Sequence, residues 1–220
     1  VSAGRCCDHV LACGPEGWLL LPIHSATVQP HGLGMDARIS WPAAAWQAGV
    51  RLPAGPIDLK TAQALLAAAQ MSGSMMVVFE QSLEHANQRQ QFGKPIGKFQ
   101  AIQHMLAELA SCVAATIASA EAAARDADEA GLEKGGSFSI AAAKSQGSEF
   151  AQRIAAISHQ SMGAMGFTHE HILHHYTRRL WVWRRDFGSE SYWGEKIGAA
   201  YAKAGPDALW AALSSSNFAA

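Results

Sequence analysis

The pattern of apolar and polar positions changes near residue 56 of this chain. Before that point, short apolar runs are separated by Gly and Pro, a spacing typical of strands and turns. The runs cover residues 9–12, 18–23, 27–29 and 38–41. The pattern predicts about three to five short strands, too few to close a barrel, followed by a crossing segment over residues 41–56.

From Ile57 onward the apolar positions take the three-and-four spacing of amphipathic helices. The first predicted helix runs from Asp58, its N-cap, to about residue 88. The second covers about residues 98–129, and Gly131 fits the position just past its end. Its apolar residues fall on one stripe of the helix surface: Phe99, Ile102, Leu106, Leu109, Val113 and Ile117.

Two further long helices complete the predicted bundle. After a break at residues 135–137, a third helix reaches about Met162, and the stretch 163–166 interrupts it. Thr168 is expected to cap a fourth helix that ends near Trp183. Shorter helices are predicted over 191–204 and 206–213.

Four long helices with short links favour an antiparallel four-helix bundle in a mainly α chain. The expected domains are a unit of short strands over 1–55, which the resemblance described below implies to be a partial β-domain remnant, and a helical-bundle domain over 56–220.

Composition narrows the functional classes. Apolar residues make up 49% and charged residues 16% of the chain, which is typical of a globular protein. A net charge of −1 disfavours a general nucleic-acid binder. The sequence has no unbroken window of about 18 uncharged apolar residues, so no membrane span is expected. Four cysteines without a CxxC spacing favour free thiols and a cytoplasmic protein.

The segment at residues 89–100, RQQFGKPIGKFQ, carries the clearest chemical signal. An Arg at a helix end can place two hydrogen bonds on a phosphate. The backbone N–H groups at the start of the following helix offer a second anion site. Together they indicate a nucleotide-cofactor diphosphate. The alternative is structural: Arg89 complements the helix dipole and Phe92 packs on the turn.

A second candidate segment is QSMGAMGF at residues 160–167. Gln160 stands at a helix end, and Gly163 and Gly166 would allow the backbone to approach a flat or charged ligand closely. The alternative is a Gly-rich turn between two helices. Taken alone, such a spacing is weak evidence for a binding site.

The order of these segments is more specific than either of them. RQQFGKPIGKFQ, a long helix, the AAAK at 141–144, the Gln160 turn and an arginine-rich helix together resemble the C-terminal half of acyl-CoA dehydrogenases, over about residues 57–194. The short strands before them resemble the end of that family's middle β-domain. The resemblance implies FAD as cofactor and a flavin site shared between subunits.

The resemblance also assigns cofactor contacts by position. Arg89, Gln91 and Phe92 would contact the diphosphate and adenosine side of the FAD of a neighbouring subunit, and Gln100 would face the same cofactor. Gln160 and the backbone at Gly163, Ala164 and Gly166 would hold the diphosphate region. Ala164 replaces a Gly that is frequent in the family, and Met165 replaces a small or polar residue.

The family's catalytic base is missing from its expected position. Phe187-Gly188-Ser189 lies where a catalytic Glu-Gly-Thr would stand, and a phenylalanine cannot accept a proton. The alternative base position, near residues 61–64, has no carboxylate either. Asp186 and Glu190 are weak candidates, because in a helix each would project about 100° or more from the direction of Phe187.

Histidines near the fourth helix raise the question of a metal site. His171 and His175 stand at i and i+4 and could share a helix face as a metal pair. Glu170 would lie on another face, so no third ligand completes the set locally. A solvated or partner-facing helix is the favoured interpretation, and no metal is expected.

These observations predict a subunit or C-terminal fragment of a FAD-dependent acyl-CoA dehydrogenase. It would contribute flavin-binding and dimer-interface residues to the α,β-desaturation of an acyl-CoA, without its own base. As an oxidoreductase it would act only with a full-length partner, in a homo- or hetero-oligomer, because the rest of the flavin enclosure is expected outside this chain. The alternative is a non-enzymatic helical oligomerisation or interaction module derived from the family.

Overall fold

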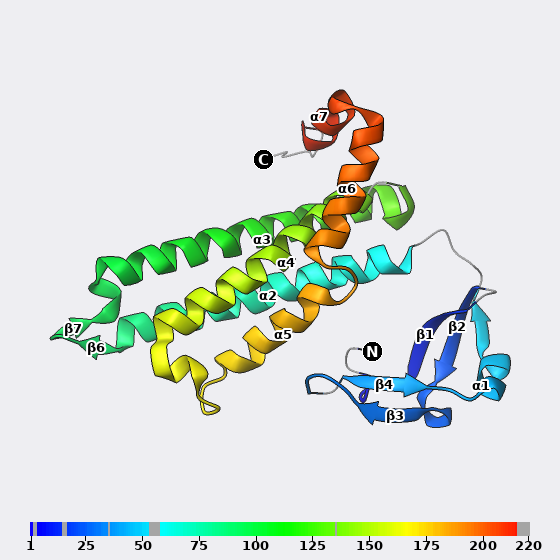
Figure 1. Ribbon diagram of the computed structural model, residues 1–220, viewed down its shortest axis with the longest axis horizontal. Helices are drawn as coiled ribbons and strands as arrows, with labels where there is room; N and C mark the ends of the chain where they lie inside the picture. The colour runs from blue at the N-terminus through cyan, green and yellow to red at the C-terminus, as the bar shows by residue number, and fades with distance from the viewer. Residues whose placement is uncertain (2–3, 15–16, 35, 53–57, 135, 215–220) are drawn as a thin grey trace. The chain divides into compact units, whose positions relative to one another are not determined.

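The computed structural model describes residues 1, 4–14, 17–34, 36–52, 58–134 and 136–214. The chain divides into two compact units, Val1–Pro56 and Ile57–Ala220, and each is described by itself (Figure 1).

The first unit is built from short antiparallel strands. A three-stranded sheet has the order β1-β2-β5, with β1 over His9–Gly14, β2 over Gly17–Pro22 and β5 over Val50–Leu52. A two-stranded sheet pairs β3, Thr27–Pro30, with β4, Ala37–Ser40. The short 3-10 helix η1, Ile23–Ser25, and helix α1, Ala43–Ala48, complete the unit. Strands β1 to β4 overlap the four predicted apolar runs. The prediction of a plain crossing segment over residues 41–56 is wrong, because α1 and β5 lie within it.

The second unit is a helical bundle. Its long helices are α2 (Leu59–Gln88), α3 (Gln100–Lys134), α4 (Gly136–Met162) and α5 (Leu173–Arg185), followed by α6 (Glu190–Ala204) and α7 (Pro206–Ser214). Between α2 and α3 lie the strands β6 (Gln90–Gln91) and β7 (Lys94–Pro95) and the 3-10 helix η2 (Ile96–Lys98). The 3-10 helix η3 (Gly163–Phe167) links α4 to α5. Figure 1 shows α2 to α5 running side by side, so the predicted fold class is confirmed.

Two apolar clusters fill the bundle. The first centres on large side chains from α2, α3, α4 and α5, among them Met71, Met75, Leu109, Ile154 and Leu180. The second consists mainly of alanines from α2, α3 and α4 with Ile140 and the buried Trp193. Because alanine side chains are short, the helices can approach closely there, and the aromatic ring of Trp193 fills the remaining space.

Local signals explain several helix ends. Asp58 caps α2: its Oδ1 accepts from the backbone N–H of Lys60 at 3.1 Å, and its Oδ2 accepts from Thr61 Oγ1 at 2.7 Å. The hydrogen bond from Thr61 is the main reason that the pKa of Asp58 is lowered. Gly131 has φ of 73° and ψ of 161°, outside the helical region, so the regular helix ends just before it, as predicted, and a short further helical stretch follows the kink as far as Lys134.

The prediction that Thr168 caps the fourth helix is wrong. Helix α5 begins at Leu173, and Thr168 Oγ1 instead donates to the carbonyl of Met165 at 3.1 Å. The side chain near the start of α5 that accepts a backbone N–H is His171, whose Nδ1 receives the N–H of Leu173 at 3.1 Å. The N-cap of α5 is Ile172, whose side chain makes no capping hydrogen bond.

Two helices are long and apolar enough to cross a membrane by length and composition, Leu59–Gln88 and Gln100–Glu129. The sequence-based expectation used a stricter criterion, an unbroken window of uncharged apolar residues, which Gln63 and Gln70 interrupt in α2, and the absence of a membrane span stays a prediction. Both helices belong to the bundle and supply part of its buried core. Core helices of globular bundles meet the same criterion, so the finding is weak evidence for a membrane.

Truncating a side chain at the centre of the first cluster should destabilise the bundle. Leu109 is fully buried, so Leu109→Ala should lower the free energy of unfolding by about 3 kcal/mol through lost apolar contacts and a new cavity. Urea unfolding followed by circular dichroism measures the change. Leu83→Ala is the matched control, because Leu83 is 39% exposed and should lose about 1 kcal/mol or less. Equal losses in both variants would contradict this packing.

Candidate functional site

The segment between α2 and α3 forms a tight hairpin at the end of the bundle. Arg89 ends α2, and its N–H donates to the carbonyl of His85 at 2.9 Å. Gln91 pairs with Lys94 across the turn. The turn residues Phe92 and Gly93 have φ of 52° and 79°, which is typical of a two-residue hairpin turn. The predicted Phe-Gly turn is confirmed.

The side chains of this hairpin project away from the core. Phe92 is 90% exposed and touches only the edge of Phe99 among aromatic rings, with centroids 6.0 Å apart. Arg89, Gln91 and Gln100 are also exposed. A phenylalanine at positive φ is uncommon and strained, and burial within this chain does not compensate for the strain. These four predicted cofactor residues are therefore accessible to a ligand or a second chain.

The second predicted segment lies at the same end of the bundle, where α4 passes into η3 (Figure 1). Gln160, Gly163 and Ala164 are exposed, and Gly163 has φ of 58°. Gly166 differs from them because it is buried. A Cβ there would lie 3.3 Å from the Cα of His159. Gly166 thus serves close packing inside the turn, and its backbone is not displayed like that of Gly163.

A hollow of about 430 Å³ lies beside this turn and is lined mainly by histidines and Arg178. The ring of His159 stacks on Phe167 at 4.7 Å, and its Nε2 lies 3.1 Å from Thr177 Oγ1. Burial lowers the pKa of His159, which favours its neutral form. Within the residues that the structure describes, no group of three or more His, Cys, Asp or Glu is arranged to hold a metal ion.

The turn between α5 and α6 contains the position of the missing base. Asp186 ends α5, Phe187 and Gly188 have φ of 59° and 106°, and Ser189 caps α6. The segment is therefore not helical, and the helical angles assumed for Asp186 and Glu190 are wrong. The carbonyl of Phe187 accepts from the indole N–H of Trp193 at 3.1 Å. The phenyl ring packs against the second apolar cluster.

Glu190, one of the two weak candidates for the base, is engaged in an ion pair. Its Oε1 and Oε2 accept from Arg184 Nη2 and Nε at 2.5 and 3.2 Å. This fork geometry is the strong form of an Arg–carboxylate contact. It is the main reason that the pKa of Glu190 is lowered. A carboxylate stabilised in its charged form by this pair is a weak proton acceptor.

A buried lysine holds the same turn in place. Lys144 is completely buried in α4, and its Nζ donates to Gly188 O at 2.7 Å, Ser148 Oγ at 2.8 Å and Arg184 O at 3.2 Å. All three hydrogens of the ammonium group are used. Burial lowers the pKa of Lys144 to about 8. In the sequence, Lys144 stands out only as the last residue of AAAK. A lysine within such an apolar, alanine-rich stretch was the available signal that this side chain is buried.

The two candidate regions are separated along the bundle. Helix α5 leads from the Gln160 turn to the Phe187 turn, and its 13 residues span about 20 Å at about 1.5 Å per residue. The exposed hairpin and the Gln160 turn both lie at one end of the bundle. Phe187, Asp186 and Glu190 are not part of that group.

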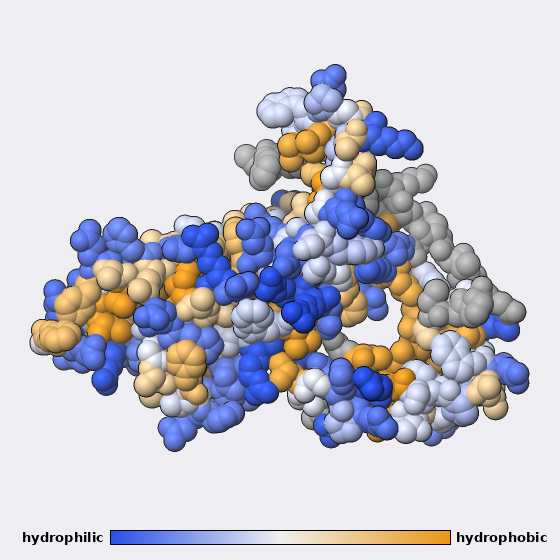
Figure 2. Space-filling view, viewed as in Figure 1, coloured by the Kyte–Doolittle hydropathy of each residue, from blue (hydrophilic) through white to orange (hydrophobic). Residues whose placement is uncertain are grey.

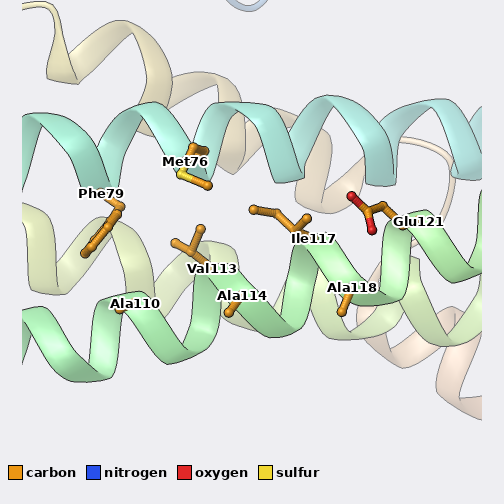
Figure 3. Close-up of a pocket in the computed structure, with 8 residues that line it drawn as sticks. All are labelled: Met76, Phe79, Ala110, Val113, Ala114, Ile117, Ala118 and Glu121. Carbon is orange, nitrogen blue, oxygen red and sulfur yellow. The ribbon is translucent and has the colours of Figure 1, made fainter. Parts of the chain in front are cut away.

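An open apolar groove of about 400 Å³ lies between α2 and α3. Figure 3 shows Met76 and Phe79 reaching from α2 towards Val113 and Ile117 of α3, with Glu121 towards one end of the groove. Three alanines of α3 complete the lining: Ala110, Ala114 and Ala118. Figure 2 shows apolar patches among polar side chains on the bundle surface, over α3 and near the hairpin.

Removing the Lys144 ammonium should loosen the Phe187 turn. Lys144→Met leaves the carbonyl of Gly188 without its donor and removes one of the two donors to the carbonyl of Arg184, which also accepts from Ser148 Oγ at 3.2 Å. The free energy of unfolding should therefore fall by about 2–4 kcal/mol. Urea unfolding measures the loss. Lys203→Met is the matched control, because Lys203 is an exposed lysine of α6 and should change stability little.

The same pair of variants tests the charge of Lys144. Its pKa is about 8 in the folded chain and near 10.5 when unfolded. Between these values the unfolded chain binds more protons, so the contribution of Lys144 to stability rises with pH. The stability difference between the unmodified chain and Lys144→Met should therefore widen from pH 8 upward. A difference that stays constant to pH 10.5 would contradict a buried ammonium with this pKa.

Comparison with known proteins identifies the bundle. The family model for the acyl-CoA dehydrogenase C-terminal domain matches residues 61–200. The chain is similar to acyl-CoA dehydrogenase FadE34 of Mycobacterium tuberculosis, with 34% identity over 137 residues, which cover 62% of this chain and 19% of FadE34.

Solved structures share the fold. Glutaryl-CoA dehydrogenase of Mycobacterium smegmatis in complex with FADH2 aligns with a TM-score of 0.69 and 20% identity, over 87% of this chain and 53% of that one. The ChsE4–ChsE5 complex of Mycobacterium tuberculosis aligns with a TM-score of 0.67 and 20% identity, over 93% and 58%. The chain thus spans little more than half of these structures. It belongs to the acyl-CoA dehydrogenase family and corresponds to that family's C-terminal domain with short strands before it.

Proposed function

We propose that this chain is a subunit, or the C-terminal part of one, of a FAD-dependent acyl-CoA dehydrogenase. It contributes flavin-binding and interface residues to the α,β-desaturation of an acyl-CoA, and it acts in complex with a full-length subunit in the cytoplasm. The observation that carries the proposal is the hairpin at the bundle end. Its Arg89, Gln91 and Phe92 are displayed to the outside in a strained turn.

The residues at this end fit part of a dinucleotide. Arg89 offers a planar fork of donors suited to a diphosphate. Gln91, Gln100 and Gln160 are exposed amides that can donate or accept hydrogen bonds. The exposed Phe92 ring offers an apolar face for a flat group, and Gly163 and Ala164 leave the backbone open. Gly166 is withdrawn into the turn, so we assign it to packing.

The chain itself supplies no proton acceptor at the expected position. When FAD is bound, its flavin ring supplies the hydride acceptor. A side chain must also remove a proton from the acyl group. Phe187 cannot do so, and Glu190 is held in its ion pair with Arg184. We therefore assign the base to the full-length partner and binding of the cofactor's nucleotide side to this chain.

An oligomer is proposed from the surface of the bundle. The residues from Thr61 to Phe79 in α2 include no charged side chain, although some of them are exposed. The apolar groove between α2 and α3 continues this surface. The ChsE4–ChsE5 complex, which shares the fold, is a complex of ChsE4 with ChsE5. These observations favour a homo- or hetero-oligomer that covers the groove.

The cofactor role is tested at Arg89. The chain is co-expressed with a full-length acyl-CoA dehydrogenase relative, and the visible flavin absorbance of the desalted complex is recorded. Arg89→Ala should reduce FAD affinity by about tenfold or more, because a charge-assisted pair of hydrogen bonds to the diphosphate is lost.

Arg125→Ala is the matched control, since Arg125 is an exposed arginine of α3 outside the proposed site. It should retain FAD like the unmodified complex. If the complex with the unmodified chain holds no FAD while the relative's own homodimer does, the cofactor role is excluded. Unchanged FAD content in Arg89→Ala, with assembly intact, would instead favour the interaction module without enzymatic function.

The interface is tested in the groove. Ala114→Arg places a long charged side chain in the apolar lining and should weaken assembly by about tenfold or more. Light scattering coupled to size-exclusion chromatography, over a concentration series, measures the dissociation. Ala124→Arg introduces the same side chain at an exposed position of α3 outside the groove and should assemble normally. Equal assembly of both variants would place the interface elsewhere.

A further inference from the structure

Two lysine ammonium groups converge on one tyrosine where α2 meets α6. Lys60 lies in the first turn of α2, and its Nζ is 3.4 Å from the centroid of the Tyr192 ring. Lys196 follows Tyr192 by one turn of α6, and its Nζ is 5.1 Å from the same centroid. The Lys196 ammonium also lies 5.5 Å from the ring centroid of Trp193. Two ammonium groups that share one aromatic ring favour a negative charge beside them.

Asp58 faces the two lysines from the start of α2 and offsets part of their charge. Asp58 is the carboxylate that acts on Lys196 across the cluster, and both its oxygens already accept the capping hydrogen bonds of α2. Glu195 is exposed on α6 beside Lys196 in sequence. The N-terminus of the 30-residue helix α2 adds a partial positive charge at Lys60. Hydrogen bonding from Lys196, and to a lesser extent from Lys60, lowers the pKa of Tyr192 against the opposing effect of burial, and the positive charges of the two lysines add to the lowering.

The cluster adjoins the turn that carries Phe187. A Cβ added to Gly188 would lie 2.6 Å from Tyr192 Cδ1 and 2.6 Å from Trp193 Nε1. Only a glycine leaves room for these two rings, and its φ of 106° also favours glycine. An anion bound by the lysines would therefore lie next to the position where the family has its base.

We propose that Lys60, Tyr192 and Lys196 form a binding site for an anionic group of the substrate, a phosphate or a carboxylate. Ammonium groups bind either group as compact charges, and the tyrosine O–H can donate a hydrogen bond to it. That the anion belongs to an acyl thioester rests on the proposed function. Binding of the anion itself does not.

Calorimetric titration of the chain with inorganic pyrophosphate, and separately with glutarate, at constant ionic strength tests the site. We expect saturable binding of at least one anion. Lys60→Met and Lys196→Met should each weaken it about tenfold, because each removes one charge from the site. Lys203→Met should leave the affinity unchanged, since Lys203 is an exposed lysine of α6 outside the cluster.

Tyrosinate absorbance provides a second measurement. A bound anion screens the lysines, so the titration midpoint of Tyr192 should rise towards its ordinary value when the anion is present. Tyr192→Phe should abolish this change and retain most of the binding. Pyrophosphate as the tighter ligand indicates the nucleotide end of the thioester, and glutarate indicates an acidic acyl group.

Lack of saturation with both anions up to about 10 mM, or equal affinity in all lysine variants, would overturn the site. Circular dichroism of each variant verifies that the bundle is folded. Failure of this proposal leaves the FAD experiment at Arg89 unaffected, because neither lysine belongs to the hairpin. Loss of FAD binding, in turn, does not alter an anion affinity measured on the chain alone.

Discussion

The buried ammonium of Lys144 is the constraint on which the second half of the bundle depends. A charge removed from water is costly unless its hydrogen bonds are satisfied. The carbonyls of Arg184 and Gly188, together with Ser148, satisfy it. These acceptors fix where α5 ends and how the chain turns into α6. The turn between α5 and α6 therefore sets the position of Trp193 in the second apolar cluster.

Two phenylalanines, Phe92 and Phe187, are the non-glycine residues with positive φ in the described part of the chain. Each carries backbone strain of about 1–2 kcal/mol, but the compensation differs. Phe187 is half-buried, and its carbonyl is held by Trp193. Phe92 is almost fully exposed and gains little from its own chain. Strain that the molecule does not offset internally is typical of a contact surface.

Local signals decided how much the sequence could predict. The Asp58 cap and the Phe92–Gly93 turn depend on neighbouring residues, and both were predictable. The start of α5 was misplaced because its N-cap is Ile172, an apolar residue that carries no capping signal, while Thr168 ends the preceding 3-10 helix η3. The burial of Lys144 was signalled by its alanine-rich surroundings, but its partners were not predictable, since Arg184 and Gly188 lie 40 and 44 positions away. The withdrawal of Gly166 into the turn likewise depends on packing between segments rather than on its spacing.

The uncharged stretch of α2 has a consequence for the life of the chain in a cell. Without charged residues from Thr61 to Phe79, this helix has little to keep its exposed apolar positions from associating nonspecifically. Binding of a partner stabilises the folded state by mass action. For a chain that works with a partner subunit, as proposed above, the amount of folded chain then depends on the supply of that partner, and the two proteins must be made in matched amounts.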